Sequence, residues 1–352
     1  MHMYMWLAHC VAGVGPTDPR FVADVQGLAR RSLPSTRIAV VVPICVKCGE
    51  ATKLIATANR WTKASGLPCM AAAGVEYTAS ASSSDARLRS ECEMLPSSDF
   101  VPRPGRMQDL ANGDISADLI IYQEMEFVQR ATAMRLFGRA AACFRKLAVV
   151  TAHLAHEDDS YPRAPNVMFY QLATELLKLR AYSYWVQLET DSVPLRPRWL
   201  EYLAARIPPR TDGFWVKGSA PRHHCSWCNL EEGYHINGNA LYNARDEAFL
   251  AFIQRTWSFA GNHTEPYDVA LFERARSSDR STWTMLGGKS VGRLFQFSDV
   301  IVSYYWPIAF ERAVRRYPCA VLLHGNHSRS HAQDLTSRLT SRAILQNAGR
   351  RL

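Results

Sequence analysis

Hydrophobic and polar positions follow one repeating order along the first half of the chain. Four short, mainly apolar runs without polar alternation are typical of strands buried on both faces, and they span residues 37–43, 117–122, 145–151 and 184–188. Between them apolar residues recur at helical spacing, which predicts helices over residues 50–63, 127–139 and 167–180. Strands that alternate with helices predict a parallel sheet with right-handed crossovers, which is the α/β fold class.

The order changes after residue 191. Short strands are predicted over residues 213–217, 236–242, 299–302 and 320–323, and helices over residues 198–206, 246–259 and 267–275. Residues 66–116 are rich in Ser, Ala and Pro and predict one weak strand and a long loop. We therefore divide the chain into an N-terminal segment (1–34), a main domain (35–327) and a basic helical tail (328–352).

The fourth apolar run ends in two carboxylates that are separated by one residue, Glu189-Thr190-Asp191, and Pro194 follows. Because side chains alternate along a strand, we expect both carboxylates to emerge on one side of its tip. In open α/β sheets ligands bind at that end of the strands. Two oxygen donors there suit Mg²⁺ or Mn²⁺ shared with substrate phosphates, although an exposed acidic turn explains the tripeptide equally well.

A second polar segment interrupts the apolar strand predicted over residues 236–242. We take its polar residues and its glycine as substrate-binding candidates: His235, Asn237, Gly238 and Asn239. Glycine inside a strand often marks the close approach of a ligand or of another backbone, and asparagine donates and accepts as sugar hydroxyls require. The alternative is a bulge in which the asparagines cap backbone groups.

The order of these motifs, and a third around His324, resembles that of the GT-A glycosyltransferases, which transfer a sugar from a nucleotide donor. Glu189-Thr190-Asp191 stands where that family carries its acidic D-x-D-type motif, and residues 234–242 are similar to the segment lining the sugar and acceptor pocket. Val321-Leu-Leu-His324-Gly325-Asn326 looks like the late strand whose histidine completes the metal shell. The resemblance covers about residues 37–328, and glutamate at the first acidic position departs from the commoner aspartate.

This resemblance implies a catalytic domain with a GT-A-like, Rossmann-type mixed sheet flanked by helices. It implies Mn²⁺ or Mg²⁺ held by Glu189, Asp191 and His324, a nucleoside-diphosphate sugar as donor, and a glycan or glycoprotein hydroxyl as acceptor. A bound cation would stabilise the negative charge that accumulates on the diphosphate leaving group. A hydrogen-bonded histidine at a strand end remains the alternative for His324.

Further candidates surround the proposed donor. Contacts with the nucleotide and its phosphates are assigned to residues of several segments: Pro43, Asn166, Lys178, Thr190 and Gly325. Asn166 opens the third predicted helix, whose amides could meet phosphate, and Gly325 allows close backbone approach. Asp191 is the first catalytic candidate. Asp268 is the second, as the base that an inverting reaction needs, or else as a favourable charge at a helix N-terminus.

Charge is concentrated at the C-terminus. The chain carries a formal net charge of +9, and residues 325–352 hold five arginines against one aspartate. Such a tail favours anionic ligands or membrane surfaces. No basic helix with stacking aromatics, RNA-recognition signature or finger-type zinc pattern is present in the sequence, so we expect no nucleic-acid partner.

Nine cysteines include two C-x-x-C pairs, Cys45/Cys48 and Cys225/Cys228. Disulfides, buried thiols, a zinc site and, for the first pair, a redox motif are all open readings. The apolar residues 1–15 are too short to span a membrane and are either the remnant of an anchor or a buried segment. The resemblance and the sequons at Asn262 and Asn326 predict a Golgi or ER lumen, with Asn326 unglycosylated because a glycan would crowd His324.

Two rival functions remain. A nucleotidyltransferase also places Mg²⁺ and carboxylates at a strand tip, and it releases pyrophosphate instead of nucleoside diphosphate. A non-catalytic glycan-binding protein on a degenerate transferase fold would lack metal-dependent nucleotide binding.

Overall fold

The computed structural model describes a set of segments that make up most of the main domain: residues 36–46, 50–69, 115–178, 182–205, 207, 213–221, 235–259, 265–277, 294–304 and 308–325. The N-terminal segment, the tail and the Cys225/Cys228 pair lie outside these residues, as do both sequons. The division into segments and domain therefore remains a prediction.

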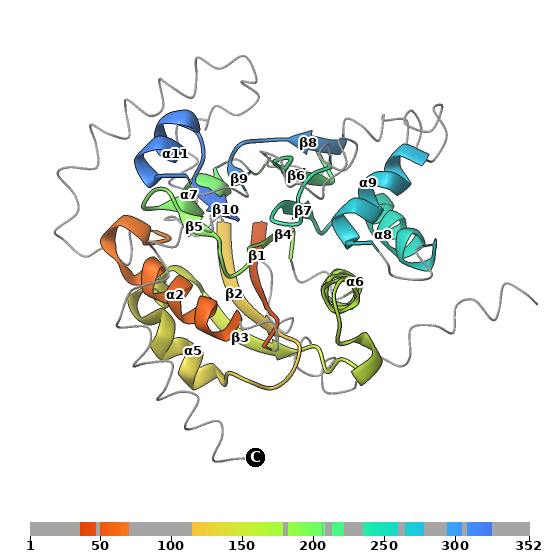
Figure 1. Cartoon of the computed structure of the whole chain (residues 1–352), viewed down its shortest axis with the longest axis horizontal. Coiled ribbons are helices and arrows are strands. Elements are labelled where there is room, and N and C mark those ends of the chain that lie inside the picture. Colours follow the sequence, from red (N-terminus) through yellow and green to blue (C-terminus); the bar gives the residue numbers. More distant parts are fainter. Residues whose placement is uncertain are drawn as a thin grey trace, which may run out of the picture.

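A seven-stranded mixed sheet forms the centre of the fold, in the order β3-β2-β1-β4-β7-β6-β8 (Figure 1). Its strands are β1 (Thr36–Ile44), β2 (Ile115–Gln123), β3 (Lys146–Thr151), β4 (Tyr184–Gln187), β6 (Val216–Gly218), β7 (Leu241–Asn243) and β8 (Phe295–Phe297). The first four are parallel, as predicted, and β7 is antiparallel to β4 and to β6. The predicted α/β class with a mixed sheet is confirmed.

A second sheet of three strands adjoins the first. It contains β5 (Val193–Pro194), β10 (Leu322–His324) and β9 (Ile301–Ser303), with β10 in the middle. β10 is antiparallel to β5 and parallel to β9. Pro194, which we expected only to end the preceding strand, lies in an edge strand, where its missing N–H leaves no ladder bond unmade.

Helices cover both faces of the large sheet (Figure 1). One hydrophobic core contains side chains of α2 (Glu50–Thr62), α5 (Arg130–Phe137) and α7 (Trp199–Ala204). A second core contains side chains of α6 (Arg163–Lys178), α8 (Glu247–Phe259) and α9 (Tyr267–Ser277). The helix α11 (Phe310–Arg316) packs on the small sheet. Short 3₁₀ helices span Ala64–Gly66, Gly138–Cys143 and His156–Asp158.

The sequence of β1 explains why two cores form. Ile38, Val40 and Val42 lie in the core beneath α2, whereas Ala39 and Val41 lie in the core beneath α6. Because neighbouring side chains of a strand point to opposite faces, a central strand covered on both faces needs apolar residues at every position.

β4 ends at Gln187, within one residue of the predicted end, so the acidic residues follow the strand. Two other predicted boundaries are wrong in ways that affect the site. The strand predicted over residues 236–242 begins only at Leu241, because residues 235–240 form an irregular loop. α6 begins at Arg163 and not at residue 167, so Asn166 lies inside its first turn.

A disulfide joins two of the described segments through Cys69 and Cys143. Cys45 and Cys319 each take part in a disulfide as well. A disulfide at Cys45 rules out a zinc-ligand role for this thiol in the folded protein. Within the described residues, none of the helices combines the length and the apolar character that crossing a membrane requires.

Candidate functional site

An acidic turn, defined as residues 189–192, connects β4 of the large sheet with β5 of the small sheet. The N–H of Ser192 donates to the carbonyl oxygen of Glu189 at 2.9 Å, which closes the turn. Glu189 and Asp191 therefore project from a turn, and the strand alternation we expected is not what places them together.

His324 reaches the acidic turn through the pairing of β10 with β5. Leu323 lies opposite Val193 in this antiparallel pair, so the next residue of β10 lies beside the turn. Its Nε2 atom is 2.9 Å from Glu189 Oε2 and 3.3 Å from Asp191 Oδ1. The possible ligand atoms of the three residues all lie within 4.8 Å of one another. Residues 135 positions apart in the chain thus form one cluster, here called the 189/191/324 cluster.

The cluster carries more negative than positive charge. Burial alone lowers the pKa of His324, but the carboxylates of Glu189 and Asp191 outweigh burial and raise this pKa to about 9. The imidazole is 3% exposed, and Asp191 Oδ1 is buried and forms no hydrogen bond beyond its 3.3 Å ion pair with His324 Nε2. Two carboxylates and one imidazolium leave an excess negative charge, and the oxygen and nitrogen donors suit a cation such as Mn²⁺.

Helix α2 supports the turn from one side. The Thr57 hydroxyl donates to the carbonyl oxygen of Thr190, and both residues are buried. The side chain of Thr190 is fully buried, whereas we had predicted that it contacts the nucleotide.

Two charged residues of α2 near the turn were missed by the sequence reasoning. Burial raises the pKa of Glu50, whose Oε2 accepts the N–H of Cys45 at 2.8 Å, and Glu189 and Asp191 raise it further. Burial lowers the pKa of Arg60, and the charge of Asp191 opposes that shift. The sequence shows that Glu50 and Arg60 have helical spacing from Thr57. It does not show that this part of α2 packs on the acidic turn, and only that packing brings the two residues near the cluster.

The asparagines that we assigned to the substrate bind the protein instead. Asn239 is fully buried, and its Oδ1 accepts the N–H of Glu189 at 2.6 Å and the hydroxyl of Ser192 at 3.2 Å. Asn237 Oδ1 accepts the backbone and side-chain N–H groups of Asn239 at 3.0 and 3.1 Å. The open alternative, asparagines that cap backbone groups, describes this loop correctly.

Gly238 is required by internal packing. A Cβ atom at this position would lie 2.0 Å from Tyr267 Oη, so the close neighbour is a tyrosine of α9 and not a ligand. Its N–H donates to Asp268 Oδ2 at 2.9 Å, and its carbonyl oxygen accepts the hydroxyl of Tyr242 at 2.9 Å.

Asp268 and His235 form a second polar group beside the loop. His235 Nε2 lies 3.4 Å from Asp268 Oδ2, while Asp268 Oδ1 accepts the N–H of Val269 at 3.0 Å. Asp268 also contributes to the raised pKa of His324, by less than Glu189 and Asp191 do, so it lies within electrostatic range of the 189/191/324 cluster.

The other predicted nucleotide contacts are more scattered. The N–H of Asn166 donates to the carbonyl oxygen of Pro162, just before α6, and its side chain donates to Glu265 O at 2.6 Å. Both groups are therefore engaged within the protein, whereas we had predicted a contact with phosphate. Pro43 lies near the end of β1, and Gly325 follows β10 with a φ of +79° that favours glycine. Lys178 ends α6, and its side chain lies outside the described residues.

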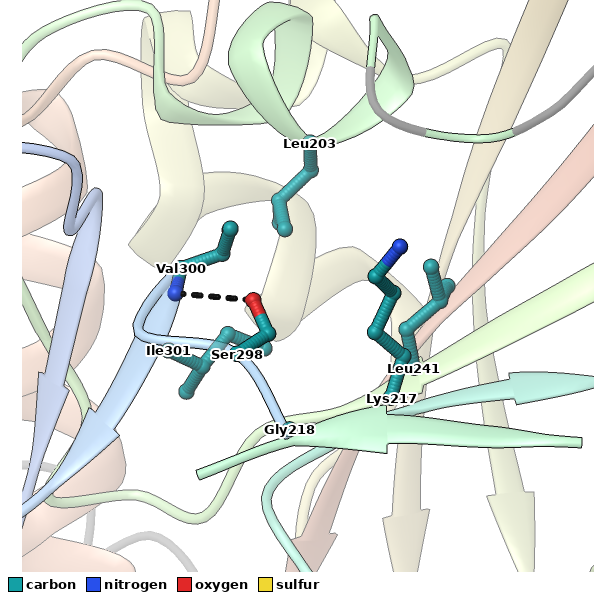
Figure 2. A pocket seen from close by; sticks show the side chains of 7 residues that line it. All are labelled: Leu203, Lys217, Gly218, Leu241, Ser298, Val300 and Ile301. Atoms are coloured by element: carbon teal, nitrogen blue, oxygen red, sulfur yellow. Dashed lines mark hydrogen bonds between the residues drawn. The ribbon is translucent and has the colours of Figure 1, made fainter. Parts of the chain in front are cut away.

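A small cavity lies apart from the cluster, between α7, β6, β7 and β9 (Figure 2). Its lining is mainly apolar, with Lys217 rising from β6 beside Leu241. Its volume of about 10 Å³ is the room that one water molecule needs. A sugar nucleotide could not enter it.

Comparisons with known proteins add little. No protein-family profile matches the chain, and no curated protein matches it. Among the solved structures that match is the galactosyltransferase LgtC in complex with donor and acceptor sugar analogues. It is 12% identical over 89% of this chain and 95% of that chain, with a TM-score of 0.36. A likeness this distant carries no argument about the activity of this chain.

Proposed function

We propose that this chain is a metal-dependent glycosyltransferase that moves a sugar from a nucleoside-diphosphate sugar to a hydroxyl of a glycan or glycoprotein. The observation that carries the proposal is the convergence of Glu189, Asp191 and His324 just beyond the carboxyl end of β4. This is the edge at which open α/β sheets bind their ligands. The motif order of the sequence supports the same function.

The chain's own residues would hold the cation in a defined way. Asp191 and His324 are the first two ligands, and Glu189 binds directly or through water. Nδ1 of His324 lies 3.4 Å from Ser303 Oγ, so a proton kept on Nδ1 leaves Nε2 as the ligand atom. When bound, the cation stabilises the charge that develops on the diphosphate leaving group.

Asp268 is the proposed base for the acceptor hydroxyl if the reaction inverts the anomeric centre. Its position within electrostatic range of the 189/191/324 cluster supports this role. Its contacts with Gly238 N–H and His235 fix the orientation of the carboxylate.

We also propose that the protein resides in an oxidising compartment such as the Golgi or ER lumen. The Cys69–Cys143 bridge and the disulfides at Cys45 and Cys319 support this location, because cytosolic reductants keep thiols reduced.

Replacement of Asp191 by Asn tests the function. The substitution removes a charged ligand while leaving the bonds that Asn239 and Thr57 make to the turn, because those bonds use the turn's backbone and Ser192. We expect Mn²⁺-dependent release of nucleoside diphosphate, measured over a panel of nucleotide sugars, to fall about a hundredfold or more.

Glu311→Gln is the matched control, because Glu311 is an exposed carboxylate of α11. It should retain full activity. Unchanged turnover in Asp191→Asn would contradict the proposal. Release of pyrophosphate by the unmodified protein would indicate a nucleotidyltransferase, and absence of metal-dependent nucleotide binding would indicate a glycan-binding protein.

A further inference from the structure

The acidic turn has few bonds of its own to fix its shape. It lies outside the strand ladders, and its one internal backbone bond joins Ser192 N–H to Glu189 O. Two of its four residues are the proposed metal ligands Glu189 and Asp191. Metal ligands lose affinity when their positions fluctuate, so a turn of this kind requires external supports.

One side chain spans the turn from end to end. Asn239 Oδ1 accepts a hydrogen bond from Glu189 N–H at 2.6 Å and another from the Ser192 hydroxyl at 3.2 Å. These donors belong to the first and last residues of the turn. Asn239 is 0% exposed, so water cannot replace its oxygen without opening the fold.

The loop of residues 235–240 holds the side chain of Asn239 in place. Its Nδ2 and its backbone N–H both donate to Asn237 Oδ1, and the N–H of Asn237 donates to Ser219 O at 3.0 Å. Both ends of the Asn239 side-chain amide are therefore hydrogen-bonded: the oxygen bonds to the acidic turn and the nitrogen bonds to the loop.

Helix α9 anchors the same loop at Gly238. The glycine N–H donates to Asp268, and Tyr267 Oη occupies the space that any larger residue would fill. Tyr267 is itself held by Gln187 at the end of β4, whose Nε2 donates to its hydroxyl at 2.5 Å. The loop is thus fixed between α9 and the strand that leads into the acidic turn.

From these contacts we infer that Asn239 is a positioning residue that sets the separation of Glu189 and Asp191 and thereby the affinity of the site for a divalent cation. It touches neither cation nor substrate. The inference rests on one part of the proposed function, namely that the 189/191/324 cluster binds a cation. It does not depend on sugar transfer.

Asn239→Ala and Asn243→Ala form a matched pair for the test. Asn243 is also a fully buried asparagine, four residues along the chain, and it bonds to Phe214 O at 3.0 Å and Arg245 N at 3.1 Å instead of to the turn. Both substitutions remove a buried amide and its bonds. A merely structural role for Asn239 predicts that the two variants behave alike.

The measurement is Mn²⁺ binding to the full, disulfide-intact chain without nucleotide, followed by the electron paramagnetic resonance signal of free Mn²⁺. We expect the dissociation constant to rise about tenfold or more in Asn239→Ala, and to stay within about twofold of the unmodified protein in Asn243→Ala. Circular dichroism reports whether each variant is folded.

Ser192→Ala keeps the test decisive if Asn239→Ala does not fold. It removes one of the two bonds to Asn239 Oδ1, and we expect it to weaken Mn²⁺ binding by a smaller factor, about threefold. Equal Mn²⁺ affinity in Ser192→Ala and the unmodified protein, or equal affinity in the two asparagine variants, overturns the inference. Failure of the unmodified protein to bind Mn²⁺ overturns both the inference and the proposed function, whereas Mn²⁺ binding without sugar transfer overturns only the latter.

Discussion

At the scale of single residues, His324 determines how the site responds to protons. Its pKa of about 9 means that the metal-free protein holds a proton on this buried imidazole at neutral pH. Nε2 faces both carboxylates, so the proton lies where a cation would bind. A cation must therefore displace this proton before it can use Nε2.

Mn²⁺ binding should consequently become tighter as pH rises from 6.5 to 8.5. In this range the proton is bound in the metal-free state and released on binding, so a higher pH favours the metal-bound state. Isothermal titration calorimetry in two buffers of different ionisation enthalpy should report close to one proton released per ion at pH 7.

His324→Gln provides the control, since it keeps a hydrogen-bonding side chain but has no titratable ring. Its weaker binding should lack the pH dependence. A flat Mn²⁺ affinity across the range in the unmodified protein would show that His324 does not bind through Nε2.

At the scale of elements, the two ends of the parallel strands carry different balances of charge. Near the amino end, Asp118 of β2 is buried and bonds to Arg37, Arg145 and Tyr182, so its charge is more than neutralised. Beyond the carboxyl end, two carboxylates share one imidazole. The 189/191/324 cluster thus has an excess of negative charge at the edge where a cation would bind, whereas the buried Asp118 leaves none at its own end.

The elements themselves were largely predictable from the sequence. The apolar run of β1 fixed its place as a central strand, because only a strand covered on both faces tolerates apolar residues at successive positions. The helices α2, α8 and α9 follow from their apolar stripes to within a few residues.

The loop of residues 235–240 could not be predicted in the same way. Its asparagines look like sugar-binding groups in a strand, and only the tertiary partners, Glu189 and Ser192, show that they support the turn. Gly238 likewise depends on Tyr267, which is 29 positions away in the chain. Sequence patterns report local spacing, whereas these contacts depend on how distant elements pack.

At the scale of the whole molecule, the 189/191/324 cluster lies where two sheets meet. The chain leaves the large sheet at β4, passes through the acidic turn and enters the small sheet at β5, which pairs with the strand that ends in His324 (Figure 1). The resemblance drawn from the sequence motifs implied this convergence, but the second sheet that produces it was not predicted.

The disulfides give a test of location at this scale. Alkylation of the denatured, unreduced protein from its native source should leave Cys45, Cys69, Cys143 and Cys319 unmodified, because each is already bridged. Mass spectrometry of the unreduced digest should recover the peptides of Cys69 and Cys143 linked to each other, and reduction should separate them. Alkylation of these cysteines without prior reduction would contradict an oxidising compartment.

The central claim is that Glu189, Asp191 and His324 hold one cation that binds a nucleoside diphosphate. A crystal of the protein with Mn²⁺ and a nucleoside diphosphate, measured at the manganese absorption edge, tests it most directly. We predict one strong anomalous peak within about 2.5 Å of both an Asp191 carboxylate oxygen and His324 Nε2, with diphosphate oxygens completing its shell. An ordered diphosphate with no manganese peak at these residues, or with the peak elsewhere, would contradict it.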